Sequence, residues 1–126
     1  MAERDKSRLG TLQLAVMRVL WERDECTVNE VHGVLAETRT VAPSTVATLL
    51  KRLEKREYIA HRTVGRQFYY KALRDERDVH RSMVSELTND LFEGDASGLV
   101  VHLLKEGDIA KGDLAHIKRL LEGRSD

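Results

Sequence analysis

The stretch from Val41 to Lys71 constrains the fold of this chain more than any other part of the sequence. Its first half places apolar residues at helical spacing on one side and small polar and basic residues on the other. Its second half reads as two short strands, Ile59–Val64 and Gln67–Lys71, joined by Gly65-Arg66. Glycine tolerates the positive φ that a tight turn needs. The segment therefore predicts a basic helix followed by a basic β-hairpin.

Two helices are expected ahead of this segment. Apolar residues recur at helical spacing from Thr11 to Trp21, which predicts the first helix. Arg23–Glu25 reads as a polar turn. Thr27 then opens a capping box with the glutamate three residues later, and it predicts a second helix that ends at about Thr38.

The third helix is expected from Pro43 to about Arg56. Proline suits the first helical position, where its missing N–H has no intrahelical partner to lose. Three short helices and a two-stranded hairpin, in this order, predict a winged helix-turn-helix.

Beyond Leu73 the pattern changes to three amphipathic helices, expected at Asp75–Phe92, Ala96–Lys105 and Asp113–Glu122. Helices this short cannot bury their apolar stripes alone, so either the winged helix or a second copy of the chain must cover them, and we expect a second copy. The expected fold is mainly α with a small β-hairpin: a winged helix-turn-helix DNA-binding domain over residues 1–73 and a helical dimerisation arm over residues 74–126. The expected dimerisation residues are Val79, Met83, Leu87, Leu91, Leu99, Val100, Leu103, Leu104, Leu114, Ile117, Leu120 and Leu121.

Charge is unevenly distributed along the chain. The formal net charge is +0, yet residues 1–74 carry 14 Lys and Arg against 9 Asp and Glu, and residues 75–126 carry 7 against 12. The window 42–74 alone has a charge of +6, with 8 basic residues against 2 acidic ones. One half of the chain is therefore suited to meet a polyanion. Solvated surface charge that segregates by chance is the alternative interpretation.

A major groove admits one helix with its side chains, and short side chains let the backbone approach closely. We expect small residues of the third helix to reach bases or phosphates. Basic residues of this helix and of the hairpin are expected to neutralise phosphates. The turn of the hairpin is expected to reach a minor groove. The expected DNA-binding residues are Ser44, Thr45, Ala47, Thr48, Lys51, Arg52, Lys55, Arg62, Arg66 and Lys71.

Other chemistries find little support. The five histidines show no metal-ligand spacing, and Cys26 is the only cysteine, so neither a metal site, a cofactor nor an internal disulfide is expected. No phosphate loop, nucleophile elbow or zinc-protease motif appears, and carboxylates near Cys26 would raise the pKa of a thiol there. No apolar run approaches the roughly 20 residues that cross a bilayer. A cytoplasmic protein without membrane insertion is expected.

The chain resembles the penicillinase-repressor family of winged-helix regulators, which includes copper-responsive relatives. The resemblance runs from Leu9 to Leu121 and is carried by Ala15–Trp21, Thr45–Leu53, Gly65–Tyr70 and Leu99–Leu103, in order and at family spacing.

The resemblance implies a homodimer that binds inverted-repeat operators, typically with TACA/TGTA half-sites, and represses the genes behind them. It also implies relief by proteolysis in the dimerisation arm, set off by a membrane-embedded metalloprotease sensor. The family's cleaved bond is Asn-Phe, and the matching positions here are His102 and Leu103. The cysteine-rich motif of copper-responsive relatives is absent from this sequence.

Two other functions stay open on the residues alone. A winged helix also serves as a protein-interaction module, which predicts a stable protein partner and sequence-indifferent DNA binding. A regulator that responds to a small molecule is the second alternative, although no pocket can be read from the sequence.

Overall fold

The structure is a computed structural model that describes residues 8–123. The chain divides into two compact units, one that ends at Met83 and one that begins at Val84. The domains expected over 1–73 and 74–126 stay a prediction, and their outermost residues, 1–7 and 124–126, lie outside the described residues.

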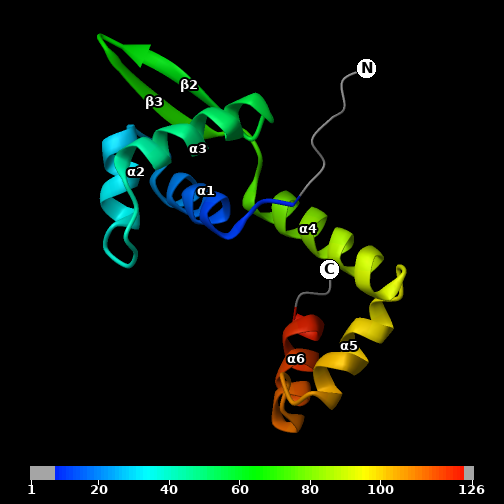
Figure 1. Cartoon of the computed structure of the whole chain (residues 1–126). Coiled ribbons are helices and arrows are strands. Elements are labelled where there is room, and N and C mark those ends of the chain that lie inside the picture. Colours follow the sequence, from blue (N-terminus) through cyan, green and yellow to red (C-terminus); the bar gives the residue numbers. More distant parts are fainter. Residues whose placement is uncertain (1–7, 124–126) are drawn as a thin grey trace, which may run out of the picture. The chain divides into compact units, whose positions relative to one another are not determined.

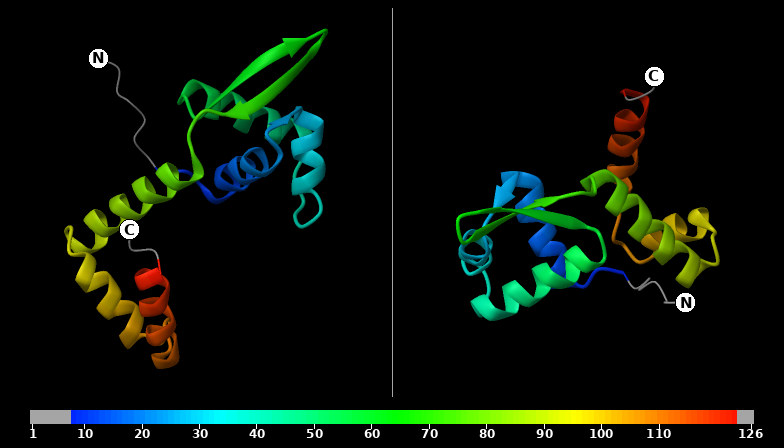
Figure 2. Two further views of the ribbon diagram at one scale, coloured as in Figure 1. Left: turned by 180° about the vertical axis from the view of Figure 1, so that it is seen from behind. Right: turned by 90° about the horizontal axis from the view of Figure 1, so that it is seen from above.

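The first unit contains three whole helices and a small sheet, followed by the first part of a fourth helix. The order is α1 (Thr11–Arg23), β1 (Glu25–Cys26), α2 (Val28–Leu35), α3 (Pro43–Lys55), β2 (Ile59–Val64), β3 (Gln67–Ala72) and the start of α4 (Glu76–Phe92). Figures 1 and 2 show the hairpin of β2 and β3 projecting beyond the helices of this unit. The expected mainly helical class, with a winged helix at its N-terminal end, is confirmed.

The expected helix signals act as predicted. The Thr27 hydroxyl accepts from the Glu30 amide at 3.2 Å, and the Glu30 carboxylate accepts from the Thr27 amide at 2.9 Å. Pro43 begins α3. His32 of α2 places Nε2 2.8 Å from the carbonyl oxygen of Val41, which ties down the turn between α2 and α3.

The expected hairpin of two strands joined at Gly65-Arg66 is present as β2 and β3. The expectation of a polar turn at Arg23–Glu25 is wrong, because Arg23 ends α1 and Glu25 begins a third strand. Glu25 and Cys26 form a short strand, and the sheet has three strands in the order β1-β3-β2. Both pairings are antiparallel, with Glu25 opposite Lys71 and Cys26 opposite Tyr70. A strand of two residues is too short to show an alternating pattern, so hydrophobic periodicity could not predict it.

One apolar core holds the first unit together. Side chains from all three helices and the sheet are fully buried there, and deletion of such a side chain typically lowers the free energy of unfolding by about 2–5 kcal/mol. The fully buried side chains are Val16, Met17, Leu20, Cys26, Val31, Val46, Leu50, Leu53 and Ile59.

The second unit follows from the last part of α4 (Glu76–Phe92) and contains α5 (Ala96–Lys105) and α6 (Lys111–Gly123). Gly94 and Gly107, both with positive φ, follow α4 and α5, as expected. From Val84 onward, no apolar side chain that the structure describes is buried. This unit therefore lacks a core of its own within one chain.

Candidate nucleic-acid interface

Helix α3 presents two contrasting faces. Val46, Leu50 and Leu53 are 0% exposed and fix the helix on the core. The opposite side carries the residues expected at the DNA. Ser44, Thr45, Thr48, Lys51, Arg52 and Lys55 are exposed, and Ala47 is half-buried. The structure therefore brings seven of the expected DNA-binding residues onto one accessible helix.

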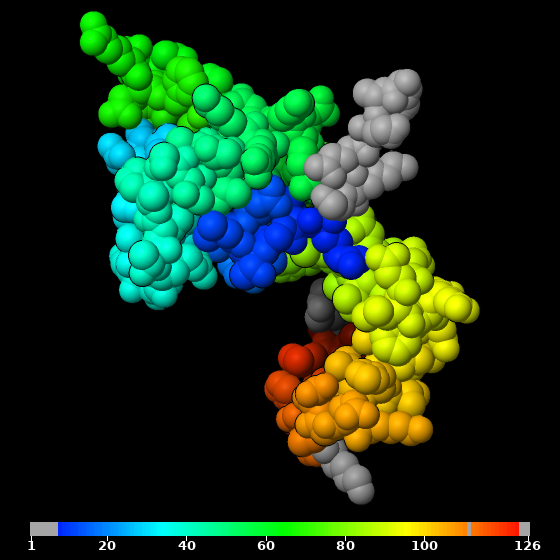
Figure 3. All heavy atoms as spheres, viewed as in Figure 1, coloured from blue at the N-terminus to red at the C-terminus, as the bar shows by residue number. Residues whose placement is uncertain are grey.

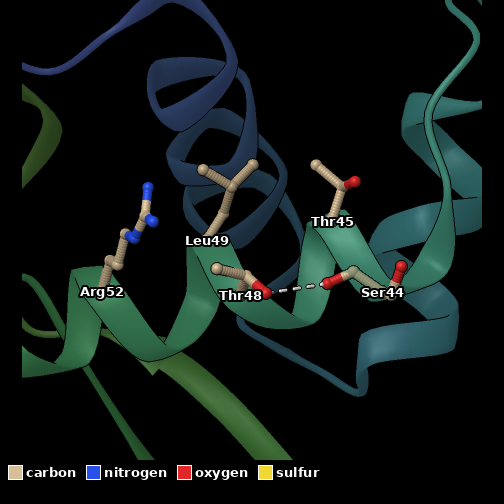
Figure 4. Close-up of a pocket in the computed structure, with 5 residues that line it drawn as sticks. All are labelled: Ser44, Thr45, Thr48, Leu49 and Arg52. Carbon is tan, nitrogen blue, oxygen red and sulfur yellow. Dashed lines mark hydrogen bonds between the residues drawn. The ribbon is translucent and has the colours of Figure 1, made fainter.

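A shallow hollow lies along this exposed side of α3. Figure 4 shows Thr45, Leu49 and Arg52 pointing to the same side of the helix, with Ser44 and Thr48 beside them. These five residues line a depression of about 230 Å³ that is open to solvent. The Thr48 hydroxyl donates to the Ser44 carbonyl oxygen at 3.1 Å, which leaves its oxygen lone pairs able to accept. A hollow this open and shallow fits the edge of a larger surface better than it fits an enclosed small molecule.

The start of α3 is favourable for an anion. Ala42 provides no side-chain cap, and the first turn contains no acidic residue. The backbone N–H groups in the first turn of a helix point out of its N-terminal end and carry partial positive charge. A phosphate near Ser44 would therefore meet both a hydroxyl and the positive end of the helix dipole.

The wing, defined as β2, β3 and the turn between them, carries Arg66 at its tip. Gly65 has a φ of 63°, the left-handed conformation that a residue with a Cβ rarely adopts. Arg66 follows it and is exposed. In the space-filling view the tip of the wing stands clear of the other atoms of this unit (Figure 3). Arg66 is thus free to reach a groove or a phosphate.

Arg62, another expected contact, is already engaged. Its Nε and Nη2 donate to the Glu25 carboxylate at 2.8 and 2.9 Å, and its guanidinium lies 5.3 Å from the centre of the Tyr69 ring. Hydrogen bonds from Arg62 lower the pKa of the Glu25 carboxyl. Lys71 is exposed but pairs with Glu25 across the β1–β3 ladder. Sequence reasoning missed this neutralisation because it placed Glu25 in a turn.

Arg74 also has a structural role that the sequence did not reveal. Its guanidinium donates to the carbonyl oxygens of Arg56 and Glu57 at 3.2 Å, just past the end of α3, and lies 4.0 Å from the centre of the Tyr58 ring. The Trp21 indole N–H donates to the Arg74 carbonyl oxygen at 2.8 Å. The charge of +6 over residues 42–74 therefore overstates the positive charge available to a ligand.

Cys26 and the histidines do not form a reactive centre. Burial raises the pKa of the Cys26 thiol, and the charge of Glu30 raises it further, so the thiolate is disfavoured. Among the residues that the structure describes, no group of three His, Cys, Asp or Glu side chains could hold a metal ion. Over the same residues, no helix has the length and apolar character needed to span a bilayer.

The expected dimerisation residues separate into two groups. Val79 is 3% exposed, and Met83 packs beside it on the core of the first unit. Both side chains are thus used within one chain, where sequence reasoning had placed them at a dimer contact. The remaining ones are half-buried or exposed: Leu87, Leu99, Leu103, Leu104 and Ile117 are half-buried, and Leu91, Val100, Leu114, Leu120 and Leu121 are exposed.

A family model described as "Penicillinase repressor" matches residues 9–123. The chain belongs to the penicillinase repressor family. Members of this family are transcriptional repressors and not enzymes, in agreement with the expectation from the sequence.

The chain is similar to other members of the penicillinase repressor family over most of its length and of theirs. The penicillinase repressor of Bacillus licheniformis is 28% identical over 115 residues, which cover 91% of this chain and 90% of the relative. The transcriptional regulator BlaI of Mycobacterium tuberculosis is 34% identical over 120 residues, covering 89% and 86%.

A solved structure supports the winged-helix assignment within the penicillinase repressor family. The monomeric form of Bacillus licheniformis BlaI, in complex with the blaP half-operator, superimposes with a TM-score of 0.50 and 35% identity. The match covers 62% of this chain and 93% of that chain.

Proposed function

We propose that this protein is a homodimeric transcriptional repressor that binds inverted-repeat operator DNA through α3 and the wing. Repression takes place in the cytoplasm, where the operator DNA is accessible. The observation that carries the proposal is the two-faced arrangement of α3, whose apolar side chains are fully buried while its hydroxyl-bearing and basic side chains face solvent.

The proposal assigns each accessible side chain a role by its reach. Ser44, Thr45 and Thr48 are short enough to meet base edges or phosphates, and Ala47 can pack on a thymine methyl group. Lys51, Arg52 and Lys55 lie further along α3 and neutralise phosphates.

In the wing, Arg66 at the tip enters a minor groove. Lys71 contributes a weaker, more distant charge because it lies opposite Glu25. Arg62 contributes only after its ion pair with Glu25 opens.

The second copy is proposed to cover the apolar side chains of the second unit. Leu91, Leu120 and Leu121 are each more than half exposed, and exposed apolar surface of this density marks a contact with another chain. Two copies joined in this way present two α3 helices to two half-sites of one duplex. Val79 and Met83 are left out of the proposed contact because Val79 is buried in the core of the first unit and Met83 packs against that core.

The test is a gel shift of the full-length protein with a duplex from the region upstream of its own gene. Binding is expected at about 50 mM salt and is expected to weaken steeply towards about 200 mM, because phosphate contacts release counterions. An excess of random duplex should fail to displace the specific complex. Absence of any shift at low salt would contradict the proposal, and equal competition by random DNA would favour a protein-interaction module.

Relief by proteolysis at His102-Leu103, by a membrane-embedded metalloprotease sensor, remains a prediction from the family resemblance. Both residues lie inside α5, where the backbone is hydrogen-bonded. Proteases cut most readily at exposed, flexible segments. Cleavage there would therefore require α5 to unwind locally first. We expect a protease added to the native protein to leave the bond between His102 and Leu103 uncut.

A further inference from the structure

A cluster of three side chains joins the wing to α3. His61 of β2 places Nδ1 2.9 and 2.8 Å from the two carboxylate oxygens of Glu54, near the end of α3. The Phe68 ring of β3 stacks on the His61 imidazole, with ring centres 3.9 Å apart and 13° between the planes. Each of the three residues comes from a different element, so the cluster connects α3 to both strands of the wing.

The wing beyond this cluster is a two-stranded ribbon. The pairing of β1 with β3 ends at Tyr70, which lies opposite His61. From there to the turn at Gly65, β2 and β3 pair only with each other, and an isolated two-stranded hairpin is marginally stable in water. Phe68 is 43% exposed, so burial does little to hold it. The direction of the wing tip therefore depends on side-chain contacts, which are that of His61 with Glu54 of α3 and that of Arg62 with Glu25 of β1.

We propose that Glu54 and His61 are positioning residues that hold the wing beside α3, so that Arg66 reaches DNA while α3 occupies its groove. This inference rests on the proposed function. A bare carboxylate in the DNA-binding half would repel phosphates. Paired with His61, the same carboxylate is screened and fixes the wing instead.

The experiment compares the wild type, Glu54→Gln, Arg66→Ala and the double variant, all full-length, for binding to the labelled upstream duplex. Arg66→Ala is expected to weaken binding about tenfold in the wild type and about twofold or less in the Glu54→Gln background, because residues that act through each other have non-additive effects. Glu54→Gln alone is expected to weaken binding. Phe68→Leu removes the stacking surface without altering Glu54 and is expected to reduce the Arg66 effect in the same way.

The result that would overturn the inference is a change in DNA affinity of the opposite sign in Glu54→Gln. If Glu54 is only a solvated carboxylate near DNA, Glu54→Gln tightens binding and leaves the Arg66 effect unchanged, which overturns the inference. If Arg66→Ala has no effect in the wild type, the wing's role in DNA binding is overturned as well. If the wild type does not bind at all, the proposed function itself fails.

Thermal unfolding of each variant checks that the fold is kept. An Arg66 effect of the same size in the wild-type and Glu54→Gln backgrounds, with both proteins folded, would overturn the inference.

Discussion

Arg62 and Glu25 form a two-point ion pair across the central strand of the sheet. Glu25 lies on β1, Arg62 lies on β2, and β3 runs between them. The pair removes one of the positive charges that the sequence assigns to the wing. It also ties the outer strand β2 to β1, which the backbone ladder alone does not connect.

Glu25→Gln is expected to strengthen DNA binding by about two- to tenfold and to increase the salt dependence by the equivalent of about one phosphate contact. The change releases Arg62 and removes a negative charge from the wing. Fluorescence anisotropy with the upstream duplex, measured over a range of salt concentrations, gives both quantities. Glu22→Gln, which removes an equal charge from an exposed position on α1, serves as the matched control. Equal gains in the two variants would show that net charge alone is responsible.

The same ion pair predicts a dependence of stability on acid pH. Because hydrogen bonds from Arg62 lower the pKa of Glu25 in the folded chain, the stabilisation is fully present above the unfolded-state pKa, near 4.5, and is lost as the pH falls through the lower folded value. The wild type should therefore lose its stability advantage over Glu25→Gln between about pH 5 and pH 3. Chemical denaturation at several pH values measures this difference, and a constant difference across the range would contradict it.

Lys51→Ala is expected to weaken binding to all duplexes to a similar extent and to reduce the slope of log affinity against log salt by about one. Lys51 is exposed on α3 beyond the short residues, where a phosphate contact is expected. Lys105→Ala removes the same charge from the end of α5, outside the expected interface. A slope that falls equally in both variants would argue against a specific role for α3.

Leu121→Glu is expected to shift the protein from dimer to monomer in sedimentation experiments at micromolar concentration. Leu121 is 63% exposed on α6, and a charge placed in an apolar contact between chains is strongly unfavourable. Val64→Glu provides the control, because Val64 is an exposed apolar residue of the wing outside the proposed contact. An unchanged dimer after Leu121→Glu would remove α6 from the contact.

The local elements of the first unit could be predicted from the sequence because their signals are local. The capping box at Thr27, the proline at the start of α3 and the Gly65 turn each act within a few residues. The buried side of α3 follows from helical spacing, and Val46, Leu50 and Leu53 are indeed fully buried.

The features that the sequence could not predict depend on residues far apart in the chain. β1 forms because Cys26 pairs with Tyr70, which is 44 positions later in the chain. Arg62 of β2 forms an ion pair with Glu25 because the sheet places β1 on the other side of β3. Arg74 counts toward the positive charge of residues 42–74, yet its guanidinium donates to the carbonyl oxygens just past the end of α3. Its backbone carbonyl oxygen accepts from the Trp21 indole. Charge counts cannot distinguish such engaged side chains from those that face solvent.

The burial of Val79 has a practical consequence for any attempt to isolate the DNA-binding half. α4 is one continuous helix from Glu76 to Phe92, and its first turns supply Val79 and Met83 to the core of the winged helix. A fragment that stops at Leu73 would leave an apolar hole in that core and discard the helix that fills it. A shortened protein intended for structural or binding work should therefore extend through Phe92, so that the helix remains whole.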